Sequence, residues 1–159
     1  MLAFKLIVFF LASLAIIYVS RLSLRHPSTH GFYRFFAWEA ILALFLINMD
    51  HWFDNPFSPA QIISWIFLLI SLFLVIYSIQ LLRRVGKPDQ QRQDEALLGV
   101  EKTSQLVTTG AYRYIRHPLY SSLLFLAWGI FFKLPSLLGG ILAAISTIFL
   151  VLTARAEET

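Results

Sequence analysis

The stretch QIISWIFLLISLFLVIYSIQLL, residues 61–82, decides the class of fold because it is long, apolar and free of charged side chains. About 20 consecutive apolar residues suffice to carry a helix across roughly 30 Å of hydrocarbon. The stretch therefore predicts a membrane-spanning helix, and with it an integral membrane protein whose first partner is the lipid bilayer.

The composition of the whole chain agrees with this prediction. Of its 159 residues 58% are hydrophobic and only 14% are charged, and the mean hydropathy is +0.70, which is typical of membrane proteins and not of soluble domains. The net charge is +4, but the basic residues cluster between apolar runs, so we expect no nucleic acid partner. Cysteine is absent, which excludes disulfides, thiolate metal sites and a cysteine nucleophile.

Four further apolar segments predict an all-α membrane bundle of about five transmembrane helices, built as a single domain over residues 1–159, with its oligomeric state left open. The expected helices cover about 2–20, 35–49, 61–82, 118–132 and 136–153. The first shows no small-x-small cleavage pattern at its end and is interpreted as a retained anchor. The second is short for a full crossing. The last two are joined by only Lys133-Leu134-Pro135, which forces an antiparallel helical hairpin.

The basic residues predict the orientation of the bundle. With five crossings, three basic regions share one side: the first connection, the long polar segment 83–117 and the C-terminus. Their members are Arg21, Arg25, Arg34, Arg83, Arg84, Lys87, Arg92, Lys102, Arg113, Arg116 and Arg155, which leaves Lys5 and Lys133 on the other side. By the positive-inside rule, segment 83–117 and the C-terminus are cytoplasmic and the N-terminus is outside. In a bacterium the membrane would be the inner one.

The stretch LVTTGAYRYIRHPLY, residues 106–120, is the one polar, ring-rich segment that leads directly into an apolar helix. Gly110 permits a tight turn and a close approach of the backbone to a ligand. Pro118 favours the first turn of a helix and keeps His117 extended, so a helix is expected to begin at the proline. Its first-turn amides and dipole favour an anion such as a carboxylate, flanked by Arg116 and His117. The alternative is that Arg113 and Arg116 are topogenic charges and that the tyrosines form an aromatic belt, namely Tyr112, Tyr114 and Tyr120.

Three acidic residues are candidates for the same site. Glu39 lies about one turn inside the cytoplasmic end of the second segment, where it either lines the site or snorkels to the interface. Glu157 and Glu158 follow the last helix, and the short hairpin connection should place them beside Arg116 and His117. They either bind a cationic or hydroxylated ligand group or belong to a solvated tail.

Other classes of site have little support in the sequence. His26 and His30 are four residues apart but lack a third ligand, so no metal site is expected. Neither a glycine-rich phosphate loop nor a Gly-x-Ser-x-Gly elbow is present. Small residues at a spacing of four in the last helix, such as Gly139 with Ala143, permit close contact between helices in lipid.

Residues 106–120 resemble the isoprenylcysteine carboxyl methyltransferase family and its bacterial relatives, which are also similar to phospholipid N-methyltransferases. The shared pattern is L-V-T-x-G-x-Y-x-x-x-R-H-P-x-Y, followed by a transmembrane hairpin and paired glutamates, here Glu157 and Glu158. The similarity extends from about Gly86 to the end of the chain.

This resemblance implies a membrane methyltransferase that uses S-adenosylmethionine at the cytoplasmic ends of its last helices and releases S-adenosylhomocysteine. The methyl group would pass to a lipophilic acceptor that enters from the bilayer. The residues implied around the cofactor are Gln105, Leu106, Val107, Gly110, Tyr112, His117, Pro118 and Tyr120. His117 and the helix amides are expected to hold its carboxylate, and Glu157 or Glu158 its ribose hydroxyls or ammonium.

Arg116 and Glu158 are the expected catalytic residues. The sulfonium is already activated, so in-line positioning in a water-poor site is expected to supply most of the catalysis.

Two alternatives remain open at this point. Family members usually continue beyond the paired glutamates with a segment that closes the cofactor site and supplies a substrate-side arginine, whereas this sequence ends at Thr159. One alternative is therefore a truncated or non-catalytic membrane paralogue. The other is an NADPH-dependent reductase of lipid or steroid double bonds, with similar membrane architecture, in which Arg83, Arg84 and Lys87 would hold a phosphate.

Overall fold

The computed structural model describes residues 2–25, 29–85 and 117–158, and every regular element in these ranges is helical. The α-helices are α1 (Leu2–Ser20), α2 (His30–Asn48), α3 (Pro59–Val85), α4 (Pro118–Phe131) and α5 (Leu137–Glu158). Two single 3-10 turns, η1 (Ser23–Arg25) and η2 (Met49–His51), follow α1 and α2. The predicted all-α bundle with a C-terminal helical hairpin is confirmed.

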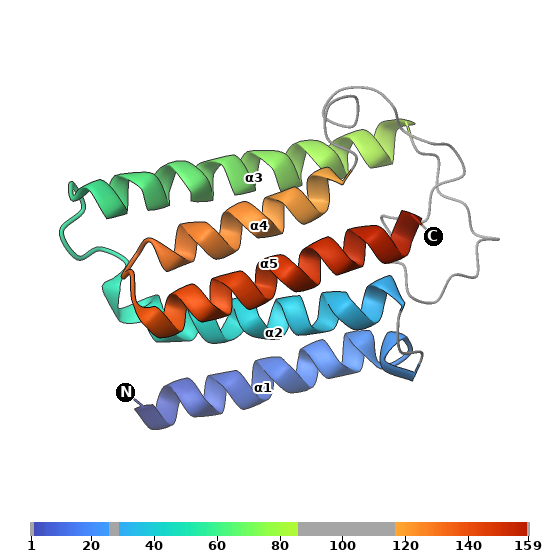
Figure 1. The fold of residues 1–159 in the computed structure, drawn as a ribbon, viewed down its shortest axis with the longest axis horizontal. Helices are drawn as coiled ribbons and strands as arrows, with labels where there is room; N and C mark the ends of the chain where they lie inside the picture. Colours follow the sequence, from blue (N-terminus) through green and yellow to red (C-terminus); the bar gives the residue numbers. More distant parts are fainter. Residues whose placement is uncertain (1, 26–28, 86–116, 159) are drawn as a thin grey trace.

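The helices lie side by side with the chain running back and forth along the bundle (Figure 1). α5 packs most extensively on α2, α4 packs most extensively on α3, and α1 lies at the edge against α2. The core forms where α2, α4 and α5 meet, and its buried members are Ile41, Leu44, Ala127, Ile130 and Ala143. The hairpin of α4 and α5 is antiparallel as predicted, but its two arms have different principal partners.

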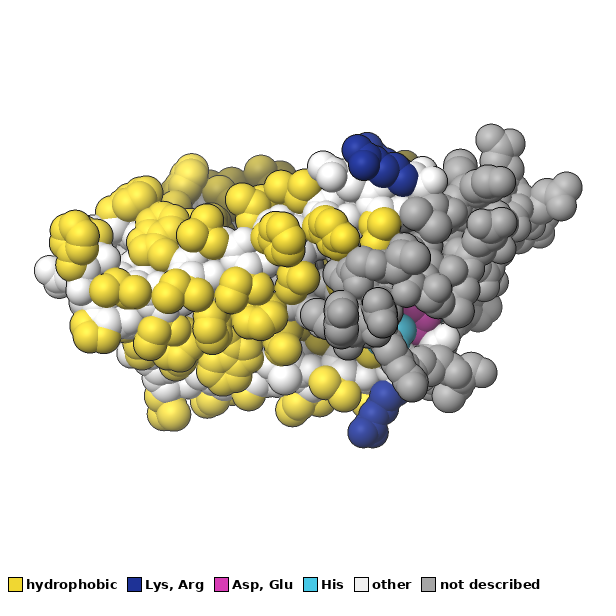
Figure 2. All heavy atoms as spheres, turned by 90° about the horizontal axis from the view of Figure 1, so that it is seen from above, with side chains coloured by type: hydrophobic (Ala, Val, Ile, Leu, Met, Phe, Trp, Pro, Cys, Tyr) yellow, Lys and Arg dark blue, Asp and Glu magenta, His cyan; other side chains and the backbone are white. Residues whose placement is uncertain are grey.

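The exterior of the bundle is suited to lipid. Within the described residues, α1, α2 with its following turn, α3 and α5 are each long and apolar enough to cross a membrane. α4 has only 14 residues and measures about 21 Å, which is less than the thickness of the hydrocarbon layer. Hydrophobic side chains cover most of the described part of the face in Figure 2, where Lys and Arg side chains appear only toward one end. An apolar surface of this extent marks an integral membrane protein.

The second helix begins earlier than predicted. It was expected over 35–49 but spans His30–Asn48, because Thr29 caps its N-terminus and its Oγ1 accepts a hydrogen bond from the Phe32 amide at 3.4 Å. Together with the following turn it reaches 22 residues, so it is not short for a crossing.

This earlier start corrects the places of two charged residues. Arg34 was expected in the connection before the helix, but it lies in the second turn of α2 and is buried. Glu39 was expected about one turn from the helix end, but it lies midway along α2.

The remaining helix boundaries differ less from the predicted ones. α3 extends beyond the predicted 61–82 at both ends, so the first residues of the predicted polar segment 83–117 are helical. α4 begins at Pro118 as predicted. Ser136 precedes α5 as a cap, since the Gly139 amide donates to its Oγ at 3.1 Å. α5 continues past the predicted residue 153, which places Glu157 and Glu158 in its last turn.

Basic residues in or directly after three helices lie at one end of the described part of the molecule. α1, α3 and α5 all finish at this end (Figure 1), and it carries Arg21, Arg83, Arg84 and Arg155. We call it the basic end. The connection between α4 and α5 lies at the opposite end together with the start of α1. The two termini therefore lie at opposite ends, which is the arrangement that five passes require.

The opposite end is closed by a buried polar cluster around Lys133, in the connection between α4 and α5. Its Nζ donates to Gln61 Oε1 at 3.0 Å and to the Trp52 carbonyl at 3.3 Å, and lies 3.5 Å from the centre of the Trp65 ring. Gln61 Nε2 donates in turn to the carbonyls of His51 at 2.9 Å and Lys133 at 3.1 Å. Only 3% of Lys133 is exposed, and this burial lowers its pKa. The sequence indicated only an exterior charge here.

Candidate functional site

The N-terminus of α4 is built as the sequence predicted. His117 occupies the cap position with φ −126° and ψ 71°, outside the helical region, because the following proline disfavours helical geometry there. Pro118 takes the first helical position and is fully buried, and the Ser121 amide donates the first helical hydrogen bond to the His117 carbonyl at 3.0 Å. The His117 side chain does not cap the helix. The first-turn amides therefore point toward the basic end.

Side chains from both arms of the hairpin meet at this N-terminus. His117 Nδ1 lies 3.4 Å from Glu157 Oε2 in the last turn of α5, and the two are an ion pair when the imidazole is protonated. The His117 ring also stacks on the ring of Tyr120, with their centres 5.6 Å apart and their planes inclined by 26°. Figure 2 shows a histidine beside an acidic side chain at this end. The predicted proximity of His117 to Glu157 is confirmed.

The N-terminus of α4 does not reach as far toward the basic end as the ends of α3 and α5 do. Two serines of α3 fix the level of α4, because Ser64 Oγ donates to the Gly129 carbonyl and Ser71 Oγ to the Ser122 carbonyl, each at 2.7 Å. From these paired levels toward the basic end, α3 continues to Val85, whereas α4 reaches only to its first residue, Pro118. At about 1.5 Å per residue, α3 extends about 15 Å farther toward the basic end. Figure 1 shows α4 stopping short of both α3 and α5.

The predicted site residues divide into three groups. His117, Pro118, Tyr120 and Glu157 come together at the start of α4. Glu158 is the last residue of α5, and its side chain lies outside the described part of the structure. The others also lie outside the described residues: Gln105, Leu106, Val107, Gly110, Tyr112 and Arg116.

Glu39 is engaged elsewhere. Its Oε2 accepts a hydrogen bond of 2.7 Å from Ser13 Oγ, which ties the middle of α2 to α1. Its other oxygen is buried and has no hydrogen-bond partner. The side chain therefore belongs to the contact between α1 and α2.

The described residues do not gather metal ligands, but they do gather several ligand-binding groups at the start of α4. No group of three His, Asp or Glu side chains in ranges 2–25, 29–85 and 117–158 is close enough to share a metal ion. At the start of α4, by contrast, amide donors, a carboxylate and stacked rings lie within reach of one ligand. Such a set can bind a molecule that carries an anionic group, a cationic group and a flat ring.

Sequence reasoning missed the serines that join α3 to α4. Ser64, Ser71 and Ser78 recur every seven residues within an otherwise apolar helix, and this spacing places them on one stripe because seven residues make about two turns. The seven-residue spacing of the serines was the signal in the sequence from which this contact could have been predicted.

Comparison with known families shows the family to which the chain belongs. A family model described as phospholipid methyltransferase matches residues 60–159, from the start of α3 through α4 and α5. No curated protein and no solved structure matched the chain. The family model covers well over half of the sequence and includes the site at the start of α4. The protein is a member of the phospholipid methyltransferase family, whose enzymes methylate lipid-like substrates in membranes.

Proposed function

We propose that the protein transfers a methyl group from S-adenosylmethionine to a lipophilic acceptor at the basic end of the bundle. The observation that carries this proposal is the site at the start of α4, where His117, Tyr120 and Glu157 surround first-turn amides that the His117 side chain does not cap. The match to the phospholipid methyltransferase family over the same helices supports it.

The residues at the site fit the groups of this cofactor. The first-turn amides and the dipole of α4 suit its carboxylate, and His117 adds a further donor beside them. Glu157 suits its ammonium or its ribose hydroxyls, and the stacked rings of His117 and Tyr120 offer a flat face. Gln105, Leu106, Val107, Gly110 and Tyr112 are proposed to complete the cofactor site, with Arg116 and Glu158 in catalytic roles.

When bound, the cofactor supplies an activated methyl group on its sulfonium. The acceptor atom forms a bond to this methyl carbon as the carbon–sulfur bond breaks, so S-adenosylhomocysteine is released. The protein's part is to hold the two reactants in line and to exclude water. The recessed start of α4 supports an acceptor delivered from the bilayer, because it lies below the ends of α3 and α5. The family match favours a phospholipid amine, and an isoprenylcysteine-like carboxylate is the second candidate.

The proposal includes an orientation. Arg21, Arg83, Arg84 and Arg155 lie at the same end as the site, and positive residues are retained on the cytoplasmic side. The site and the C-terminus are therefore assigned to the cytoplasm, where S-adenosylmethionine is made, and the N-terminus to the outside. The membrane is the inner one if the organism is bacterial.

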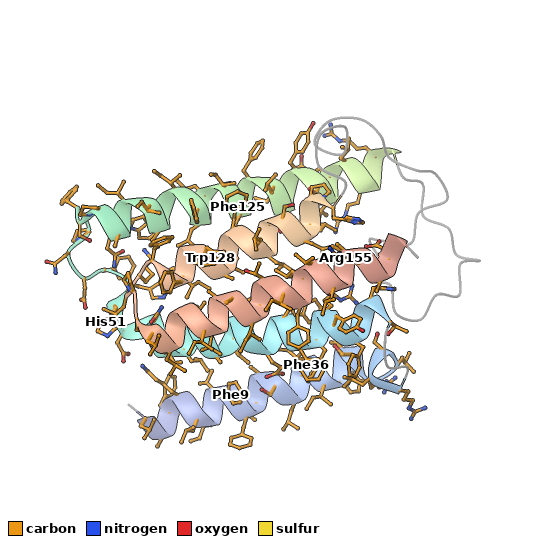
Figure 3. All side chains as sticks on the ribbon, viewed as in Figure 1. Phe9, Phe36, His51, Phe125, Trp128 and Arg155 are labelled. Carbon is orange, nitrogen blue, oxygen red and sulfur yellow. The ribbon has the colours of Figure 1, made fainter. Side chains whose placement is uncertain are left out.

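A ligand titration tests the proposal directly. The purified full chain in detergent is titrated calorimetrically with S-adenosylhomocysteine and with NADPH, alongside His117→Ala and the matched control His51→Ala. His51 pairs with Asp54 at the end far from Arg155 (Figure 3). We expect S-adenosylhomocysteine to bind, His117→Ala to weaken it about tenfold or more because a donor to a charged group is lost, and His51→Ala to leave it unchanged.

Two results would overturn the proposal in different ways. Binding of NADPH without S-adenosylhomocysteine would identify a reductase. Binding of S-adenosylhomocysteine, without methyl transfer from S-adenosylmethionine to vesicles of phosphatidylethanolamine or to a prenylated cysteine, would identify a non-catalytic paralogue.

A further inference from the structure

Ser78 is the third member of the serine series on α3, and it differs from the other two. Ser64 and Ser71 donate to α4 carbonyls that are also seven residues apart. Ser78 is 0% exposed, yet its Oγ has no hydrogen-bond partner. It does not use the carbonyl four residues back, as Thr147 and Thr153 of α5 do. A buried hydroxyl without a partner is unfavourable and calls for an explanation.

The series also shows where Ser78 lies relative to α4. Ser78 is two turns, or about 10 Å, beyond Ser71 on the stripe that faces α4. The first residue of α4, Pro118, is only about 6 Å beyond Ser122, the partner of Ser71. Ser78 therefore lies about 4 Å past the start of α4. Ser78 is therefore on the side toward which the first-turn amides point.

Two independent features thus point to one ligand group. The first-turn amides of α4 are donors that the His117 side chain does not cap, and the Ser78 hydroxyl is a buried donor just beyond them. Donors on the same side of a helix N-terminus suit an anion. Glu157 is an acceptor near the same place through its contact with His117, so it suits a neighbouring cation. A carboxylate beside an ammonium has this combination of charges.

We propose that Ser78 is a binding residue that donates a hydrogen bond to the carboxylate at the amino-acid end of the cofactor. This assignment rests on the proposed function. It adds α3 to the two arms of the hairpin as a wall of the site. It also gives the three serines two distinct roles, since Ser64 and Ser71 set the register of α4 and Ser78 binds the ligand held at its end.

The test compares ligands with and without the amino-acid group. S-adenosylhomocysteine is titrated against the wild type and Ser78→Ala, together with 5′-methylthioadenosine and a decarboxylated analogue that keeps the amine. We expect Ser78→Ala to weaken S-adenosylhomocysteine about tenfold, because a hydrogen bond to a charged group is lost. The affinities for the two ligands without a carboxylate should not change. Ser78→Thr, which keeps the hydroxyl, should retain most of the affinity.

Ser146→Ala is the matched control. Ser146 is also 0% exposed with an unpartnered Oγ, but it lies midway along α5, so its loss should change no affinity. Wild-type binding of S-adenosylhomocysteine that Ser78→Ala leaves intact, or weakens equally for all three ligands, would refute the role of Ser78 and leave the proposed function standing. Absence of wild-type binding to S-adenosylhomocysteine would overturn both.

Discussion

Several polar side chains in the apolar helices are used to satisfy backbone carbonyls of α4. The last carbonyls of a helix have few partners within it, and in lipid an unsatisfied carbonyl is costly. Three side chains from α2 and α3 donate to carbonyls at or just beyond the end of α4. The pairs are Asn48 to Ile130 at 2.8 Å, Gln61 to Lys133 at 3.1 Å and Ser64 to Gly129 at 2.7 Å. Polar residues in these spans thus stabilise the helix with the shortest length.

Gln61 has the largest share in this network, and its replacement gives the first prediction. Gln61→Leu removes the acceptor of Lys133 Nζ and the donor to two carbonyls. We expect the free energy of unfolding to fall by roughly 1–3 kcal/mol, because buried polar groups lose their partners. The measurement is thermal unfolding in detergent. Gln80→Leu, at an exposed position of the same helix, is the control, and equal shifts in the two variants would contradict the prediction.

At the scale of elements, the contact between α3 and α4 depends on Gly129. A Cβ atom there would lie 3.0 Å from two side-chain carbons of Leu68 and 3.2 Å from its backbone nitrogen. At Gly140 the nearest atom, from Phe131, would be 3.7 Å away, which is an ordinary contact. Close approach of α4 to α3 therefore requires a glycine at the first position and not at the second.

The second prediction uses this difference. Gly129→Ala should lower stability by about 1–3 kcal/mol because α4 must move away from α3 and from the Ser64 hydroxyl. Gly140→Ala should raise it by about 0.5–1 kcal/mol, since alanine favours a helix more than glycine does. The measurement is the midpoint of thermal unfolding of each variant, compared with that of the wild type. If Gly129→Ala were as stable as Gly140→Ala or more stable, α3 and α4 would not be in close contact at Gly129.

The sequence predicted these elements where one local signal dominates. Long apolar runs indicated the five helices, and Pro118 marked the start of α4. The start of α2 and the end of α5 were missed. A helix can continue beyond the hydrocarbon layer with polar residues, which are well solvated there, so an apolar run does not mark its full length. At Thr29 a cap and a loop residue look alike in sequence.

The candidate site was predictable for a similar reason, but only in part. The short connection after α4 implied that His117 and Glu157 approach one another. The contacts of Lys133 and the proposed role of Ser78 depend on the register between α3 and α4, which one sequence does not provide.

At the scale of the whole molecule, the third prediction concerns orientation. The chain has no cysteine, so single cysteines report their own accessibility. Asp54→Cys, at an exposed position between α2 and α3, and Arg155→Cys, exposed near the end of α5, lie at opposite ends of the bundle. In intact cells a membrane-impermeant maleimide should label the first, and should label the second only after permeabilisation. The reverse pattern would invert the proposed topology.

The pairing of α5 with α2 means that residues 60–159, the segment matched by the family model, do not form a self-contained packing unit. The family match begins at residue 60, whereas the principal partner of α5, α2, lies before it. The segment shared with the family therefore presents an interface that only its neighbouring sequence completes. Residues 60–159 produced alone would therefore leave uncovered the apolar face of α5 that α2 buries in the full chain.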